Sequence, residues 1–113
     1  MKILVAIKQV PERDAQIRVA SDGKWIDESD LSYTINEPDA YALEEALQLK
    51  EKNGGEVIVL SAGPERVTST LREALAKGAD RAIHIEADDL GSRDTLGVAQ
   101  ILADAVKAEA PDL

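Results

Sequence analysis

The chain has 113 residues, 44% of them hydrophobic, and its 13 basic and 22 acidic side chains give a formal net charge of −9. This charge disfavours nucleic acid and anionic membrane surfaces as partners, and no apolar run is long enough to cross a bilayer. Cysteine is absent, which excludes disulfides, thiolate metal sites and cysteine nucleophiles. We therefore expect a single domain over residues 1–113, located in the cytoplasm, without a metal site or a membrane span.

The first predicted element is a strand over residues 2–7, whose apolar run is continuous rather than alternating. Continuous runs are typical of strands that are covered on both faces in a parallel sheet. Pro11 interrupts the pattern, because proline has no amide hydrogen and restricts the residue before it. Residues 16–19 then alternate polar and apolar, and a Ser-Asp-Gly turn separates them from residues 24–27. This pattern predicts a small antiparallel hairpin over about residues 16–27.

A helix is predicted from about Asn36 to Lys52, because Pro38 stands near its first position, acidic residues cluster at its start and Gly54 follows its end. The expected inward stripes of this helix and the next are Leu43, Ala46, Leu47 and Lys50, and Val67, Leu71, Ala74 and Leu75. The remaining elements are a strand over residues 56–61, a helix that Gly78 ends, a strand over residues 81–86 and a helix that ends before Pro111. In the last helix we expect the inward residues to be Leu96, Ala99, Leu102, Ala103 and Val106.

This alternation predicts a Rossmann-like α/β fold, with a parallel sheet, helices on both faces and the inserted antiparallel hairpin. The final residues, 111–113, resemble the approach to a fourth parallel strand. We therefore expect the sheet to be truncated before that strand, with one edge bare. Sheets of this kind bind ligands beyond the carboxyl ends of their strands, so candidate site residues are sought there.

Neither the glycine fingerprint of dinucleotide sites nor the P-loop pattern occurs in the chain. Three segments nevertheless fall at strand ends or helix starts on the ligand side. The small residue Ala6 would let backbone amides approach a flat ring, and Ala62 leaves the entry to the second helix open. Asn36 offers an amide that both donates and accepts, which suits a purine edge. Singly these residues could be core or cap residues, but together they describe a purine pocket.

The other candidate residues favour structural roles. His84 is the only histidine and lies in the middle of the third predicted strand without an evident catalytic companion. Trp25, Tyr33 and Tyr41 are too few and too scattered to form a base-stacking platform, so we expect them to pack in the core or at an interface.

Several segments together resemble one family, the β subunits of electron transfer flavoproteins. The resemblance lies in residues 1–8, the acidic helix over residues 36–51, residues 57–64 and residues 74–84. It spans nearly the whole chain and corresponds to the amino-terminal half of the family's β subunits. The order of the segments and the intervening hairpin agree with the family, which makes the resemblance specific.

The resemblance implies a subunit of a soluble electron carrier that performs no catalysis with its own side chains. The partner would be an α subunit that holds FAD, and electrons would pass from acyl-CoA or other dehydrogenases to a quinone oxidoreductase or another acceptor. The β subunit would bind AMP in a structural role, or FAD in electron-bifurcating relatives. Carried over by position, the nucleotide-binding residues are Ala6, whose backbone would meet the adenine, Asn36, Glu37, Pro38 and Asp39 along the nucleotide, and Ala62 over the ring.

Two departures from the family pattern matter. Many members place proline directly after the asparagine, whereas this chain has Glu37 there and Pro38 one position later. The family's phosphate-binding loop also lies in the half that the resemblance does not cover, so we expect this chain to bind nucleotide weakly or not at all. Two alternatives remain: a stand-alone adenine-nucleotide-binding module of the universal-stress type, and a hydrolase or pyrophosphatase of the same fold. The hairpin over residues 16–27 favours the electron carrier over the first, and the lack of a serine- or glycine-rich loop after the first strand disfavours the second.

Overall fold

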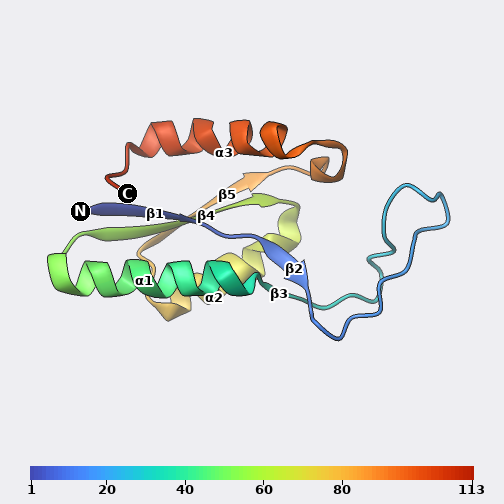
Figure 1. The fold of residues 1–113 in the computed structure, drawn as a ribbon, viewed down its shortest axis with the longest axis horizontal. Coiled ribbons are helices and arrows are strands. Elements are labelled where there is room, and N and C mark those ends of the chain that lie inside the picture. The colour runs from blue at the N-terminus through green and yellow to red at the C-terminus, as the bar shows by residue number, and fades with distance from the viewer.

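The computed structural model describes all residues from 1 to 113 and contains two sheets and three α-helices. The elements in chain order are β1 (Lys2–Ala6), β2 (Gln9–Pro11), β3 (Tyr33–Ile35), α1 (Glu37–Asn53), β4 (Glu56–Gly63), the 3₁₀ turn η1 (Glu65–Val67), α2 (Thr68–Lys77), β5 (Arg81–Glu86), the 3₁₀ turn η2 (Leu90–Ser92) and α3 (Thr95–Glu109). The strands β1, β4 and β5 form a parallel sheet in the order β1-β4-β5. Helices α1 and α2 cover one face and α3 the other (Figure 1), which confirms the predicted fold class. No helix is both long and apolar enough to span a bilayer.

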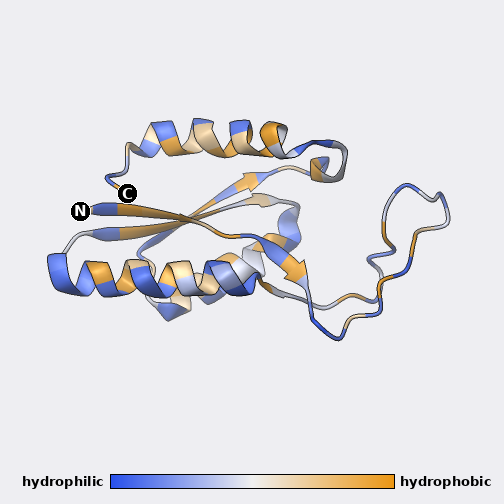
Figure 2. Cartoon of the chain, viewed as in Figure 1, coloured by the Kyte–Doolittle hydropathy of each residue, from blue (hydrophilic) through white to orange (hydrophobic).

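The central strand β4 explains why its sequence is continuously apolar. All four residues from Val57 to Leu60 are fully buried, because neighbouring strands flank β4 and helices cover both its faces. Figure 2 shows hydrophobic residues along most of the sheet, with hydrophilic ones at the strand starts. A strand that is buried on both faces does not need polar residues at every second position. The continuous apolar run of β4 therefore already indicated a parallel sheet.

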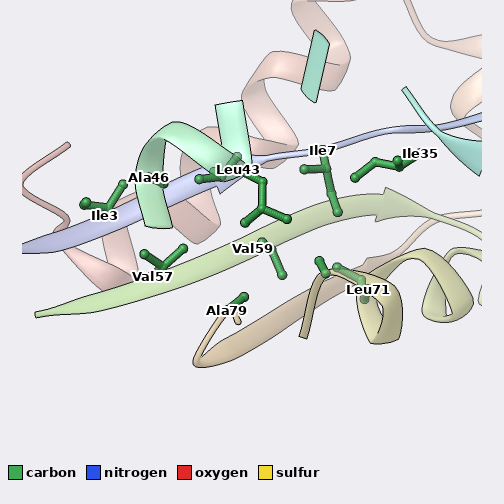
Figure 3. Packing of buried hydrophobic residues seen from close by; sticks show 11 residues of the cluster. Ile3, Ile7, Ile35, Leu43, Ala46, Val57, Val59, Leu71 and Ala79 are labelled. Atoms are coloured by element: carbon green, nitrogen blue, oxygen red, sulfur yellow. The ribbon is translucent and has the colours of Figure 1, made fainter. Parts of the chain in front are cut away.

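The main core lies between the sheet and helices α1 and α2. Leu43 and Ala46 of α1 are 1% and 3% exposed, and they lie over the side chains of Ile3, Val57 and Val59 (Figure 3). From α2 the buried members are Thr70, Leu71 and Ala74. The predicted stripe of α1 is therefore confirmed at Leu43 and Ala46, whereas Leu75 of α2, also predicted to point inward, is 39% exposed.

The face of α3 that packs on the sheet is rotated relative to the predicted one. Leu96 is 66% exposed and Ala99 and Ala103 are exposed, whereas Leu102 and Val106 are half-buried. The half-buried residues of the helix are Gly97, Val98, Ile101, Leu102, Ala105, Val106 and Glu109. Their spacing of three and four residues is a complete helical stripe, which the exposed alanines obscured in the sequence because alanine tolerates either face. No residue of α3 is fully buried.

An ion-pair cluster fastens the end of α3 to the start of the sheet. The Arg81 guanidinium donates to Glu56 at 3.1 Å and to Glu109 at 2.7 Å, and Lys2 Nζ lies 3.5 Å from Glu109. Hydrogen bonds from Arg81 hold the pKa values of the Glu56 and Glu109 carboxyls below their ordinary range, and the two carboxylates raise the pKa of Arg81. The cluster joins β4, β5 and α3 at the end of the sheet opposite to the strand carboxyl ends.

The segment between β2 and β3, residues 12–32, extends away from the sheet in Figure 1 and is called the arm below. The predicted hairpin within it is present only as one antiparallel bridge, Val19 to Ile26. Two backbone bonds flank this bridge, from Ala20 N to Trp25 O at 2.7 Å and from Asp27 N to Arg18 O at 2.8 Å. The arm therefore turns back where the sequence predicted, but without regular strands.

The regular antiparallel pair lies instead at the base of the arm, where β2 pairs with β3 in the register Gln9 to Ile35, Val10 to Thr34 and Pro11 to Tyr33. From the sequence, Pro11 was predicted to interrupt the strand pattern. Pro11 lies in an edge strand, since β2 has β3 as its one partner, and edge strands tolerate the missing amide hydrogen. Pro11 therefore belongs to β2 and does not interrupt it.

Residues 112 and 113 lie along the free edge of β1. Asp112 N donates to Lys2 O at 2.8 Å, Leu113 N donates to the same oxygen at 3.3 Å, and Leu4 N donates to Leu113 O at 2.8 Å. This alternation of bonds is that of a parallel pair. The residues expected to approach a fourth parallel strand therefore lie beside β1, on the side opposite to β4.

Candidate functional site

The direction of winding reverses at β1. The connections β1-α1-β4 and β4-α2-β5 run across one face of the sheet, whereas α3 crosses the other face and delivers residues 112–113 to the opposite edge of β1. Such a reversal opens a crevice outside the carboxyl end of the strand at which it occurs, and open α/β sheets bind their ligands there. The candidate site is therefore the carboxyl end of β1 with the adjoining end of β4.

Ala6 ends β1 at this point, and its side chain is exposed. Ile7 N donates to Leu60 O at 2.8 Å, so residue 7 bonds toward β4. Because successive residues of a strand direct their backbone groups to opposite sides, the N–H and C=O of Ala6 point to the open edge. The site thus presents an adjacent donor and acceptor beside a side chain too small to cover them.

The amino terminus of α1 is fixed against the same strand end. Asn36 N donates to Lys8 O at 2.9 Å, and Lys8 N donates to Asp39 Oδ2 at 2.9 Å. The Asn36 side chain makes no capping bond to the helix. Two of the predicted residues, Asn36 and Asp39, are thereby bonded to Lys8, which lies two residues after Ala6. The side-chain amide of Asn36 remains free to bind a ligand.

The remaining predicted residues near α1 lie further toward solvent. Glu37 is exposed, accepts a bond from Tyr41 Oη at 3.0 Å and forms an ion pair with Arg13 of the arm. Pro38 is exposed in the first turn of the helix. The fold therefore brings Ala6, Asn36 and Asp39 together, with Glu37 and Pro38 at their rim. Tyr41 is 69% exposed and therefore does not pack in the core, so its packing at an interface stays a prediction.

Ala62 lies near the end of β4 and lines a cavity of about 750 Å³. The other residues lining this cavity are Ile7, Lys8, Gln9, Lys24, Trp25, Glu28, Gly63, Pro64, Arg66, Val67, Ala87, Asp88, Asp89, Leu90, Gly91, Ser92, Val98 and Leu102. They come from the ends of β1 and β4, from the arm, from η2 and from α3. Of the predicted site residues only Ala62 is among them, whereas Ala6, Asn36 and Asp39 lie at the neighbouring edge of β1, next to Ile7 and Lys8 of the cavity wall.

Arg66 organises the wall between the arm and the sheet. Its guanidinium donates to Gln9 Oε1 at 2.8 Å and to Glu28 Oε1 at 3.1 Å, and it lies 4.1 Å from the ring centroid of Tyr33. Gln9 in turn donates to Thr70 Oγ1 at 2.9 Å. Charge-assisted bonds of this kind are stronger than neutral ones, so this network holds the base of the arm beside α2.

Two further side chains clarify the roles expected from the sequence. His84 Nε2 lies 2.8 Å from Gly63 O, so the ring braces the end of β4, consistent with a structural role. Asp89, in the cavity wall, receives a hydrogen bond from Arg93, which lowers the pKa of its carboxyl. The sequence analysis did not find the cavity residues Trp25, Arg66 and Gly91. The one available signal was that Trp25 is the only tryptophan of the chain.

The fold and the crevice at β1 define an open, doubly wound α/β domain. Residues 24–113 match the family model of the electron transfer flavoprotein domain. The whole chain is 44% identical to electron transfer flavoprotein subunit beta of Methylophilus methylotrophus and 40% identical to that of Bradyrhizobium diazoefficiens, and it covers 44% and 45% of these proteins. Over 95% of its length it is also 44% identical to protein FixA of Azorhizobium caulinodans, of which it covers 38%.

The chain belongs to the electron transfer flavoprotein family, in its β-subunit branch. This confirms the family resemblance found in the sequence. The chain spans less than half the length of the curated relatives it matches.

Proposed function

We propose that the chain is part of the β subunit of a heterodimeric electron transfer flavoprotein in the cytoplasm. The subunit binds an adenine nucleotide, pairs with an α subunit that holds FAD, and carries electrons from acyl-CoA or other dehydrogenases to a quinone oxidoreductase or another acceptor. When bound, FAD supplies the electron-carrying chemistry, and this chain's residues bind and orient the nucleotide. Membership of the family and the names of the relatives, which describe electron-transfer subunits, support this proposal.

The observation that carries the nucleotide site is the open backbone of Ala6 beside the amino terminus of α1. Adenine presents a ring nitrogen that accepts and an amino group that donates, which complements one backbone N–H and C=O pair. The exposed methyl group of Ala6 leaves room for the ring. The free amide of Asn36 contacts the nucleotide from one side and Ala62 covers the ring from the other, with Glu37, Pro38 and Asp39 along its edge.

The role of Asp39 in this arrangement is to position rather than to contact. Its carboxylate accepts the bond from Lys8 N and so holds α1 at the end of β1. Lys8, Lys24 and Arg66 are the cations that line the cavity, and Arg66 is already paired with Glu28. The family's phosphate-binding loop lies in the half of the β subunit that this chain does not cover. We therefore expect AMP to bind this chain in the millimolar rather than the micromolar range, because each charge-assisted bond that is missing removes about 1.5–3 kcal/mol.

An NMR titration with AMP tests the site. Amide signals of Ala6, Asn36 and Ala62 should shift together and saturate at millimolar AMP, and Ala6→Val should abolish these shifts because the larger side chain covers the backbone edge. Ala42→Val, on the exposed surface of α1, is the matched control and should bind as the parent does. Shifts that persist unchanged in Ala6→Val would contradict the proposed pose.

Co-expression of the full-length parent with its neighbouring gene product tests the wider function. A yellow heterodimer with a flavin absorption spectrum is the expected result. A colourless monomer that retains ATP would instead indicate the stand-alone module of the universal-stress type, which the family match disfavours.

A further inference from the structure

The single tryptophan of the chain, Trp25, lies in the arm and contacts Gly91 of η2. A Cβ placed on Gly91 of η2 would meet three atoms of the six-membered ring of Trp25 at 3.0–3.2 Å, so the indole rests directly on the backbone of that glycine. Trp25 lines the cavity that also contains Ala62, and 52% of its surface remains exposed. A large aromatic side chain is thus held at the cavity with about half of its surface uncovered.

The position of the indole is fixed by a chain of polar contacts that begins in the sheet. Trp25 Nε1 donates to Glu28 Oε1 at 3.1 Å, and the same oxygen accepts from Arg66 at 3.1 Å. Arg66 is itself bonded to Gln9 of β2. The indole is therefore held both by this chain of polar contacts and by its contact with Gly91, although its own segment has no regular strand.

We propose that Trp25 forms an aromatic wall of the nucleotide site, against which a flat ring of the bound nucleotide packs. This inference rests on the proposed function, since it adds a contact to the site at Ala6 and Ala62. The same cavity is also lined by the apolar side chains of Leu90, Val98 and Leu102. A ring between these side chains and the indole would exchange water for apolar and aromatic surface on both its faces.

The size of the effect follows from stacking of bases on aromatic side chains. Replacing such a side chain by alanine weakens binding by roughly 5- to 150-fold, the equivalent of about 1–3 kcal/mol. Trp25→Phe keeps a flat apolar ring and should lose only a few-fold. Gly91→Ala should weaken binding less than Trp25→Ala does, because a methyl group 3.0–3.2 Å from the ring shifts the indole only slightly and leaves it in the chain.

The experiment follows the indole N–H signal of Trp25, which is unique in the spectrum, during NMR titrations with AMP and with FAD. We expect this signal to shift in parallel with the amides of Ala6 and Ala62. Gly91→Ala should lower the affinity read from Ala62, whereas Thr95→Ala, at an exposed position of α3 that does not line the cavity, should not. A response to both ligands would place adenine at the indole, and a response to FAD alone would place the flavin ring there.

The outcomes separate this inference from the function on which it rests. Shifts at Ala6 and Ala62 with a stationary indole signal, and with unchanged affinity in Trp25→Ala, would overturn the role of Trp25 and leave the nucleotide site in place. A shifting indole with stationary Ala6 and Ala62 amides would support the aromatic wall and refute the proposed pose. No shift at any of the three positions at saturating millimolar ligand would overturn both.

Discussion

Gly63→Ala is expected to destabilise the chain strongly, because the end of β4 combines an unusual backbone with a tight contact. Gly63 has φ +152°, and a Cβ at this position would lie 2.8 Å from Cγ1 of Val67. Val67 is 2% exposed, so its side chain has little room to move away. The backbone contributes about 1–3 kcal/mol and the overpacking about 1–3 kcal/mol, a loss of about 2–6 kcal/mol from the 5–15 kcal/mol typical of a domain.

A double-mutant cycle separates the two contributions. In a Val67→Ala background the clashing methyl group is gone, and the remaining Val67 Cβ lies 3.9 Å from the new methyl group, an ordinary contact distance. Gly63→Ala should therefore cost less in that background by about 1–3 kcal/mol, the overpacking part. Urea unfolding followed by circular dichroism measures all four free energies of unfolding. An equal cost of Gly63→Ala in both backgrounds would refute the contact, and a cost below about 0.5 kcal/mol in the parent would refute the whole argument.

Three further predictions concern the core and the ion pairs. Leu43→Ala should lower the free energy of unfolding by about 2–5 kcal/mol in urea titrations, since this side chain is 1% exposed; a loss under 1 kcal/mol would contradict its core position. Ser61→Ala should raise that free energy by about 1 kcal/mol, because the buried Ser61 hydroxyl has no hydrogen-bond partner; a clear loss would reveal a bond to this hydroxyl. The pKa values of Glu56 and Glu109 are lowered in the fold, so their stabilising effect is complete above the ordinary glutamate value of 4.5 and is lost as pH falls below it. Arg81→Gln should flatten this acid-side decline in a series of unfolding curves, and an unchanged pH profile would argue against the cluster.

The family assignment and the position of the nucleotide site depend on different kinds of information. Residues 24–113 match the family model, but neither Ala6 nor any residue of β1 lies within that range. The site at β1 is instead carried by geometry: the free edge of Ala6, and the bonds of Lys8 to Asn36 and Asp39. The Ala6→Val titration therefore tests the site without reference to family membership.

The arm shows where local sequence patterns fail. Its alternation predicted a regular hairpin, yet only the Val19–Ile26 bridge forms, and the exposed fractions of Ile17 and Val19 are 54% and 71%. Alternating residues build a strand only when one face is buried against something. The arm extends away from the sheet, so no such face is available along most of its length.

The sequence by itself determined the positions of the three parallel strands and of α1, because short runs rich in apolar and β-branched residues, and helix-end residues such as Pro38 and Gly54, act over a few neighbouring positions. It also contained the pattern of small residues at the strand ends, including Ala6 and Ala62. Only the tertiary structure decided which edge of β1 stays open, which face α3 turns to the sheet, and that Trp25 rests on Gly91. These features depend on contacts between residues far apart in the chain, and neither composition nor periodicity within one segment encodes its distance to another.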